Sequence, residues 1–186
     1  DYNTLESAGT YGFSEAAFDR FMAALEIPQY DLETLCRIVG VSERKKMEPE
    51  AVEIQKIFST NEILDLGKML YYFFKKYEDP SSWLVRYVSE ILLAVRTDDR
   101  VERSPRDKNA AVGPSPRAAE DAKALSRFFA FIDGEDEIYP EHVKRAVRYS
   151  FFGKFAVKAK VINSGKNERV IIEEALSRVP ISGARR

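Results

Sequence analysis

Apolar residues recur three and four positions apart along much of the chain, which is the spacing of one face of an α-helix. The stretches that show this pattern or open with a helix-start residue are residues 60–74, 83–96, 117–132, 140–152 and 168–178. Pro140 suits the first turn of its helix, because proline has no N–H to leave unpaired there. The pattern predicts a mainly α-helical protein.

Two more helices are expected earlier in the chain. Asp31 can accept hydrogen bonds from the free N–H groups of a first helical turn, so a helix should begin after it and end at Gly40. The charged residues 42–46 then form a linker, and a second helix covers about residues 49–58. Cys36 lies on the apolar face of the first of these helices and is expected in the core.

The start of the chain has a different pattern. Residues 1–14 are rich in Gly, Ser and Thr and are expected to form a loop before a short helix at residues 15–20. Residues 21–27 are compact and apolar and are followed by Pro28, which is typical of a short strand. One strand alone cannot pair its backbone groups or cover both faces, so its partner strands are expected to lie outside this sequence.

A long polar segment, residues 97–116, separates two of the predicted helices. A loop of this length inside a compact domain is usually functional or disordered. It ends in Ser115 and Pro116, which suit the N-cap and the first turn of the helix that follows. Residues 157–163, later in the chain, are expected to be extended or irregular.

The composition argues against several classes of function and of site. The 29 basic and 30 acidic side chains nearly cancel, which argues against a nucleic-acid-binding protein that relies on net positive charge. Cys36 is the only cysteine, so no internal disulfide can form and a reducing compartment, the cytoplasm, is favoured. His142 is the only histidine, which argues against a histidine-based metal site or catalytic triad. It is expected to be exposed near the start of its helix.

Several short motifs, in this order along the chain, resemble those of MoxR-type AAA+ ATPases. They are Asn3 with residues 9–11 (Gly-Thr-Tyr), residues 15–21 (Glu-Ala-Ala-Phe-Asp-Arg-Phe), residues 113–118 (Gly-Pro-Ser-Pro-Arg-Ala), Gly134 with residues 139–144 (Tyr-Pro-Glu-His-Val-Lys), and residues 171–180. Each motif is short, but together they have the family's order and extend over nearly the whole chain.

The resemblance implies that residues 1–30 are the C-terminal end of an AAA+ α/β core and that residues 31–186 are a helical lid domain with a C-terminal helix. It also implies a homo-oligomeric, hexameric ring that uses ATP and Mg²⁺ to remodel partner proteins or to help metal cofactors enter them, often with von Willebrand A-domain partners. Residues 164–166 (Ser-Gly-Lys) lack the upstream glycine of a phosphate-binding loop. This chain alone is therefore not expected to hydrolyse ATP.

Three residues fall on the family's nucleotide-sensing positions. Asn3 matches sensor 1, which orients the attacking water, although a turn residue would have the same local sequence. Arg20 matches the arginine finger that reaches the phosphates of a neighbouring subunit; the alternative is a surface arginine paired with Asp19 or Glu15. Arg117 matches sensor 2, which contacts the nucleotide of its own subunit. The alternative is an ordinary arginine at a helix start, where the helix dipole disfavours a cation.

Two other functions are consistent with the sequence. One is a non-enzymatic helical module that binds partner helices through its aromatic faces. The other is a subunit of an AAA+ ring that acts on nucleic acid, which the near-zero net charge disfavours.

Overall fold

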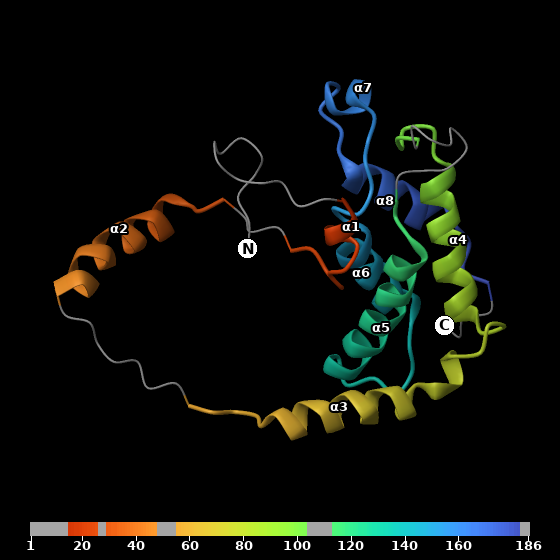
Figure 1. Ribbon diagram of the computed structural model, residues 1–186, viewed down its shortest axis with the longest axis horizontal. Helices are drawn as coiled ribbons and strands as arrows, with labels where there is room; N and C mark the ends of the chain where they lie inside the picture. Colours follow the sequence, from red (N-terminus) through yellow and green to blue (C-terminus); the bar gives the residue numbers. More distant parts are fainter. Residues whose placement is uncertain (1–14, 26–28, 48–54, 104–112, 183–186) are drawn as a thin grey trace. The chain divides into compact units, whose positions relative to one another are not determined.

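The computed structural model describes residues 15–25, 29–47, 55–103 and 113–182 (Figure 1). By its contacts the chain divides into two compact units, one made of residues 1–24 with 69–186 and the other of residues 25–68. The first unit, called the helical body below, contains the packed core and the candidate site.

The described residues are mainly α-helical, as the sequence pattern predicts. The elements are α1 (Glu15–Phe18), α2 (Leu32–Met47), α3 (Thr60–Phe73), the short 3₁₀ helix η1 (Lys75–Tyr77), α4 (Trp83–Thr97), α5 (Pro116–Ile132), α6 (Pro140–Phe151), α7 (Ala159–Ile162) and α8 (Glu168–Arg178). Within the described residues one isolated β-bridge joins Val101 and Val157 in antiparallel orientation. The predicted helices that form α5, α6 and α8 have nearly the bounds expected from the sequence.

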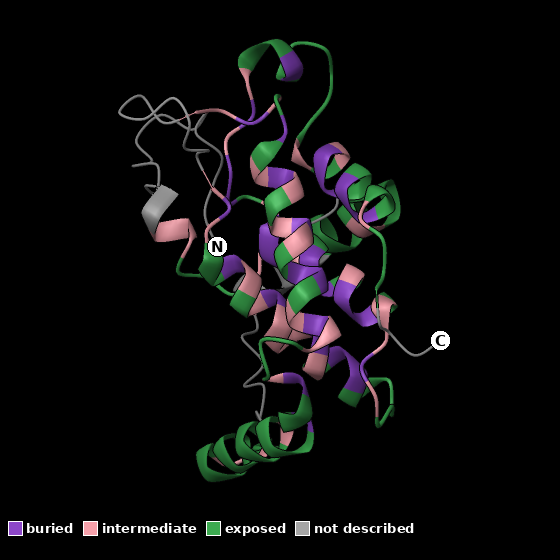
Figure 2. Ribbon diagram, turned by 90° about the vertical axis from the view of Figure 1, so that its right-hand side faces the viewer, coloured by how far each residue is buried: buried purple, intermediate pink, exposed green. Residues whose placement is uncertain are grey.

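Helices α4, α5, α6 and α8 of the helical body pack around one apolar core (Figure 2). Its fully buried large side chains include Leu84, Ile91 and Val95 of α4, Val143, Val147 and Phe151 of α6, and Ile171 and Ile172 of α8. Ala118 and Ala122 of α5 and Ala146 of α6 are also fully buried, and their small side chains allow close helix packing. Burying one large apolar side chain contributes about 1.5–3 kcal/mol, so this core is the main source of stability.

Two predicted helix starts are confirmed by their hydrogen bonds. At the start of α2, the Thr34 N–H donates to Asp31 Oδ1 at 2.7 Å. Before α3, the Ser59 N–H donates to Glu62 Oε2 at 2.6 Å, and the Glu62 N–H donates to Ser59 Oγ at 3.2 Å. This reciprocal pair is a capping box, which satisfies N–H groups that have no partner inside the helix.

Helix α2 is longer than predicted. It continues through Gly40 to Met47, so the predicted helix end at Gly40 and the predicted linker at residues 42–46 are wrong. Glycine costs about 1 kcal/mol inside a helix but does not forbid it, and the Glu, Arg and Lys residues that follow favour helix. Cys36 is exposed, contrary to the expectation that it lies in a core. Within its own unit, residues 25–68, no described element packs against α2.

Residues 21–25 do not form the predicted strand, and the rest of that prediction, residues 26 and 27, lies outside the described residues. The Ala24 N–H instead donates to the backbone carbonyl of Tyr149 in α6 at 2.9 Å. A strand needs a neighbouring strand to pair its backbone groups, and the described part of the chain supplies none at this place.

Two smaller differences concern helix bounds. Residues 55–58 are not helical, although the sequence predicted a helix as far as about residue 58, and residues 49–54 lie outside the described part. Helix α7 forms one turn in a segment that was expected to be irregular. Val161 of this turn is buried, which gives the turn an apolar contact with the core.

A buried carboxylate holds the C-terminal end of α4. Asp98 Oδ1 accepts hydrogen bonds from the backbone N–H and the Nε of Arg100, both at 2.9 Å, and Oδ2 accepts from Arg100 Nη2 at 2.8 Å. The same guanidinium donates to Glu174 of α8 at 2.5 Å. The hydrogen bond from the Arg100 side chain is the largest cause that lowers the pKa of Asp98 below its usual value. The ionised Asp98 therefore helps to join α4 to α8 through Arg100.

Replacing Asp98 by asparagine should destabilise the helical body at neutral pH. A hydrogen bond to a charged group contributes about 1.5–3 kcal/mol, and D98N should lose a similar amount at pH 7. Because folding lowers the pKa of Asp98, its contribution is complete above the unfolded pKa, near 3.8, and disappears as the pH falls through the folded pKa. Urea unfolding, followed by the fluorescence of the single tryptophan, should show a smaller D98N effect below about pH 3.

The control for this prediction is Asp65, whose exposed carboxylate pairs with Lys68 at 3.0 Å. Asp65→Asn should change the free energy of unfolding by less than about 1 kcal/mol at either pH. Equal losses in the two variants would contradict the role assigned to Asp98.

Candidate functional site

The candidate site lies at the start of α5, where the Gly-Pro-Ser-Pro-Arg-Ala motif is found. Ser115 is the N-cap, and its Oγ accepts a hydrogen bond from the Arg117 N–H at 3.2 Å. Pro116 occupies the first helical turn, where its missing N–H leaves no donor unpaired. Ala118 is fully buried against the core. The motif therefore sets both where α5 begins and which side of it faces the core.

Gly113 fits where no other residue does. Its φ is +66°, in the left-handed region that favours glycine, and a Cβ placed on it would lie 1.9 Å from the backbone carbonyl oxygen of Lys154. The Lys154 ammonium is buried and pairs with Asp121 Oδ2 of α5 at 2.8 Å. The segment after α6 is therefore held against Gly113 and, through the Lys154 ammonium, against α5.

Helix α4 also contacts residues 113–115, which precede α5. Arg96 Nη1 donates a hydrogen bond to the carbonyl oxygen of Pro114 at 2.8 Å. Pro114 is buried, so its carbonyl needs a partner from the protein. Residues 113–115 are thus fixed by α4 and by the segment that follows α6.

The structure brings the Asp-Arg-Phe motif to the same place. Ser115 Oγ donates a hydrogen bond to Asp19 Oδ1 at 2.6 Å, across 96 residues of sequence. Asp19 and Arg20 lie in the turn after α1, and the Arg20 N–H donates to the Ala17 carbonyl at 3.1 Å. Two motifs that are far apart in the sequence are therefore joined through Ser115.

Both predicted arginines are exposed. Among the described residues, no hydrogen-bond or ion-pair partner is found for the guanidinium of Arg20 or of Arg117. Of the two alternative partners predicted for Arg20, no ion pair with Asp19 is found among the described residues, and the side chain of Glu15 lies outside the described part. The third predicted residue, Asn3, lies outside the described residues. Within the described part of the chain, two always-charged guanidinium groups are therefore exposed beside the start of α5 and the turn after α1.

Sequence reasoning identified Ser115 as a helix cap but missed its bond to Asp19. It also expected His142 to be exposed, and this is wrong: His142 is 7% exposed. Its Nδ1 accepts a hydrogen bond from the Tyr139 N–H at 3.0 Å, and its Nε2 faces Asp133 at 3.5 Å. His142 therefore caps its own helix start and also faces an acidic side chain at the end of α5.

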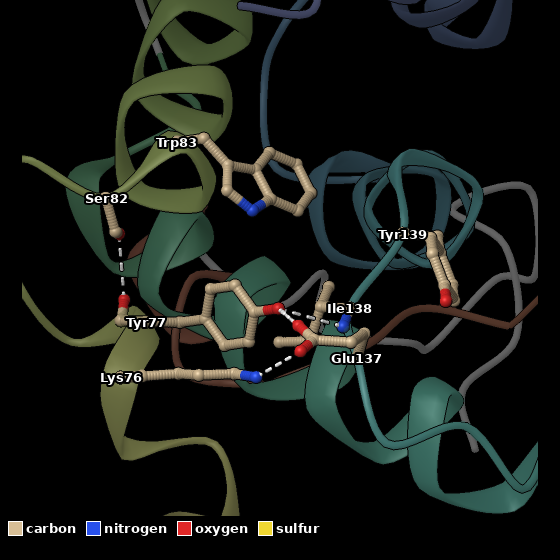
Figure 3. A pocket seen from close by; sticks show the side chains of 7 residues that line it. All are labelled: Lys76, Tyr77, Ser82, Trp83, Glu137, Ile138 and Tyr139. Atoms are coloured by element: carbon tan, nitrogen blue, oxygen red, sulfur yellow. Dashed lines mark hydrogen bonds and ion pairs between the residues drawn. The ribbon is translucent and has the colours of Figure 1, made fainter. Parts of the chain in front are cut away.

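A separate hollow of about 300 Å³ lies between η1, the start of α4 and the segment before α6 (Figure 3). Glu137 holds its walls together: it accepts from Lys76 Nζ at 2.5 Å and from the hydroxyl of Tyr77. Trp83 and Tyr139 line the hollow as well. Because its one carboxylate is already paired with a lysine, the hollow presents aromatic walls with little net charge, and no predicted site residue lines it.

The chaperone MoxR1 of Mycobacterium tuberculosis is 28% identical over 145 residues, which cover 76% of this chain and 35% of that protein. The crystal structure of a proposed ATPase from Cytophaga hutchinsonii superimposes with a TM-score of 0.73 at 24% identity, covering 97% of this chain and 52% of that chain. No protein-family model matches the chain.

The predicted resemblance to MoxR-type AAA+ ATPases is confirmed. The mainly helical fold expected for the lid region of such an ATPase is also confirmed. The chain spans about a third of the MoxR chaperone and about half of the solved ATPase chain. Within its described residues, no helix is both long enough and apolar enough to cross a membrane.

Gly113→Ala should strongly destabilise this MoxR-like helical body. The new methyl group would collide with the Lys154 carbonyl, and alanine would also be strained at positive φ. We expect a loss of about 3 kcal/mol or more, at the upper end of single-residue effects. The matched control is Gly165→Ala, because Gly165 has φ +76° but no atom within 4 Å of an added Cβ. Gly165→Ala should lower the free energy of unfolding by only about 1–2 kcal/mol, which is the cost of backbone strain at positive φ. Similar losses in urea unfolding of the two variants would contradict the close contact.

Proposed function

We propose that the chain is the C-terminal portion of a MoxR-type AAA+ ATPase, which couples ATP hydrolysis to chaperone-like remodelling of partner proteins or to insertion of metal cofactors. The observation that carries this proposal is the placement of Arg20 and Arg117. Both are exposed, neither has a partner among the described residues, and their segments are joined by the bond from Ser115 to Asp19. The similarity to the MoxR1 chaperone supports the same function.

Arg117 acts in this proposal as sensor 2 and contacts the phosphates of the nucleotide bound to its own subunit. A cation at the first turn of a helix is locally disfavoured by the helix dipole. Arg117 is at that position in α5 and has no compensating acidic partner among the described residues. A bound phosphate would supply the missing negative charge.

Arg20 acts as the arginine finger and contacts the nucleotide of a neighbouring subunit. A guanidinium is always protonated and planar, so it can stabilise the charge that develops on the transferred phosphoryl group. Asn3 is the proposed sensor 1 residue, which orients the attacking water. These assignments require ATP to bind between subunits, and we therefore propose a homo-oligomer, a hexameric ring.

The division into domains follows from the same proposal. We assign residues 1–30 to the end of the AAA+ α/β core and residues 31–186 to the helical lid. The hydrogen bonds from Ser115 to Asp19 and from Ala24 to Tyr149 would then lie at the junction of core and lid. ATP and Mg²⁺ are the proposed cofactors.

The residues present fit the phosphate groups better than the metal. Arg20 and Arg117 offer positive charge to phosphates, whereas the described residues hold no cluster of three or more His, Cys, Asp or Glu side chains suited to a metal ion. We therefore assign the Mg²⁺ ligands to residues outside the described part. The proposed partners are client proteins, including von Willebrand A-domain proteins, rather than nucleic acid, and the proposed location is the cytoplasm.

A non-enzymatic interaction module is the second candidate function. It is favoured by the exposed apolar side chains of α2, such as Leu32 and Val39, and separately by those of α3, such as Ile63. Full-length protein that binds no ATP but still binds client helices would support this candidate instead.

Arg20→Ala in the full-length protein should abolish ATP hydrolysis and leave nucleotide binding largely intact. Loss of an arginine finger is expected to lower kcat by roughly 10³-fold or more. Arg117→Ala should weaken nucleotide binding as well as turnover, because it removes a contact to the nucleotide of its own subunit. Steady-state ATPase assays and fluorescent-nucleotide titrations measure the two effects separately.

The control is Arg86→Ala, which removes an exposed pair with Glu90 at 2.8 Å on α4. Arg86→Ala should leave kcat and the dissociation constant for ATP within about twofold of the wild-type values, since exposed ion pairs contribute little. Full turnover in the Arg20 variant would show that the finger assignment is wrong.

A further inference from the structure

Ser115 connects Asp19 to the backbone of Arg117. Its hydroxyl donates to Asp19 Oδ1 at 2.6 Å and accepts from the Arg117 N–H at 3.2 Å. A hydroxyl has one hydrogen and two lone pairs, so both hydrogen bonds form at the same time. The bond to the carboxylate is charge-assisted and therefore the stronger of the two. A displacement of the first turn of α5 is thus passed directly to Asp19.

Arg20 lies between two attachments to the helical body. Asp19, immediately before it, is bonded to Ser115, and Ala24, after it, donates its N–H to the carbonyl of Tyr149 in α6 at 2.9 Å. The two attachments use different helices of the body. The backbone at Arg20 is therefore positioned by α5 on one side and by α6 on the other.

The residues that precede Ser115 are held in place by several contacts. Gly113 lies against the carbonyl of Lys154, and the Lys154 ammonium pairs with Asp121 within α5. Arg96 binds the carbonyl of Pro114. These contacts fix the two residues before Ser115, and the hydrogen bond from the Arg117 N–H holds its hydroxyl at the first turn of α5.

We propose that Asp19 is a positioning residue that couples Arg20 to the helix that carries Arg117. This inference rests on the proposed function, in which Arg117 contacts the nucleotide of its own subunit and Arg20 contacts that of a neighbour. A nucleotide-dependent movement of α5 passes through Ser115 and Asp19 to the base of Arg20. The bond between Ser115 and Asp19 therefore links two successive ATP sites of the ring.

The test uses full-length protein and separates kcat from nucleotide affinity. Asp19→Ala removes the acceptor but leaves Ser115 as the N-cap of α5, so Arg117 keeps its place and Arg20 loses one attachment. We expect kcat to fall roughly 10- to 100-fold, as when a catalytic group loses its orientation. The dissociation constant for ATP should change by less than about twofold, because the cap of α5 is intact.

Two substitutions of Ser115 make the test sharper. Ser115→Asp keeps a good N-cap but places a second carboxylate against Asp19, so it should reproduce the Asp19→Ala result. Ser115→Thr keeps both hydrogen bonds, so its kcat should equal that of the wild type. The double variant D19A/S115D should be no slower than either single variant, because both changes break the same bond.

The matched control is Asp79, whose Oδ1 accepts from the Ser81 hydroxyl at 2.5 Å in an exposed turn. Asp79→Ala removes the same pair of groups away from both arginines and should leave kcat and affinity within about twofold. A Tm near that of the wild type in Asp19→Ala establishes that its loss of turnover is not a folding defect.

The outcomes distinguish the two proposals. If Asp19→Ala hydrolyses ATP at the wild-type rate while Arg20→Ala does not, the coupling role of Asp19 is wrong and the proposed function stands. If Arg20→Ala is also fully active, the proposed function itself is wrong. Equal losses of kcat and affinity in Asp19→Ala would likewise contradict the coupling role.

Discussion

Gly113 approaches the backbone carbonyl of Lys154 so closely that no side chain fits between them. This contact fixes where the chain can turn into α5, and the buried pair between Lys154 and Asp121 keeps the same two segments together. The placement of Ser115, of the exposed Arg117 and of the bond to Asp19 all follow from it. A steric constraint on one backbone atom thus helps to set where α5 and its N-cap begin.

Several basic side chains near the site have structural partners. Arg96 binds a carbonyl, Arg100 binds Asp98, and the ammonium of Lys154 is buried against Asp121. Arg20 and Arg117 differ because the described residues offer them no acceptor. The guanidinium groups of Arg20 and Arg117 therefore keep their charge exposed at the proposed nucleotide-sensing positions.

Local features were predictable from the sequence, and features that depend on distant residues were not. Asp31, Ser59 and Ser115 mark helix starts because a cap bonds to N–H groups a few residues away. The end of α2 was misplaced, since one glycine weakens a helix without stopping it. The bond between Ser115 and Asp19 joins positions 96 residues apart, and periodicity carries no information about such a contact. Family resemblance supplied Arg20 and Arg117, but not the bond that joins their segments.

The buried pair of Lys154 and Asp121 has a consequence for how this fold diverges. The two residues are 33 positions apart, and the Lys154 side chain is 2% exposed. Losing Asp121 alone leaves the buried Lys154 ammonium without its partner, which is far more costly than losing both charges to apolar residues. Neither position can therefore drift independently during evolution. Lineages should either retain both charges or exchange them together, so these two sites are expected to covary even where the surrounding surface changes freely.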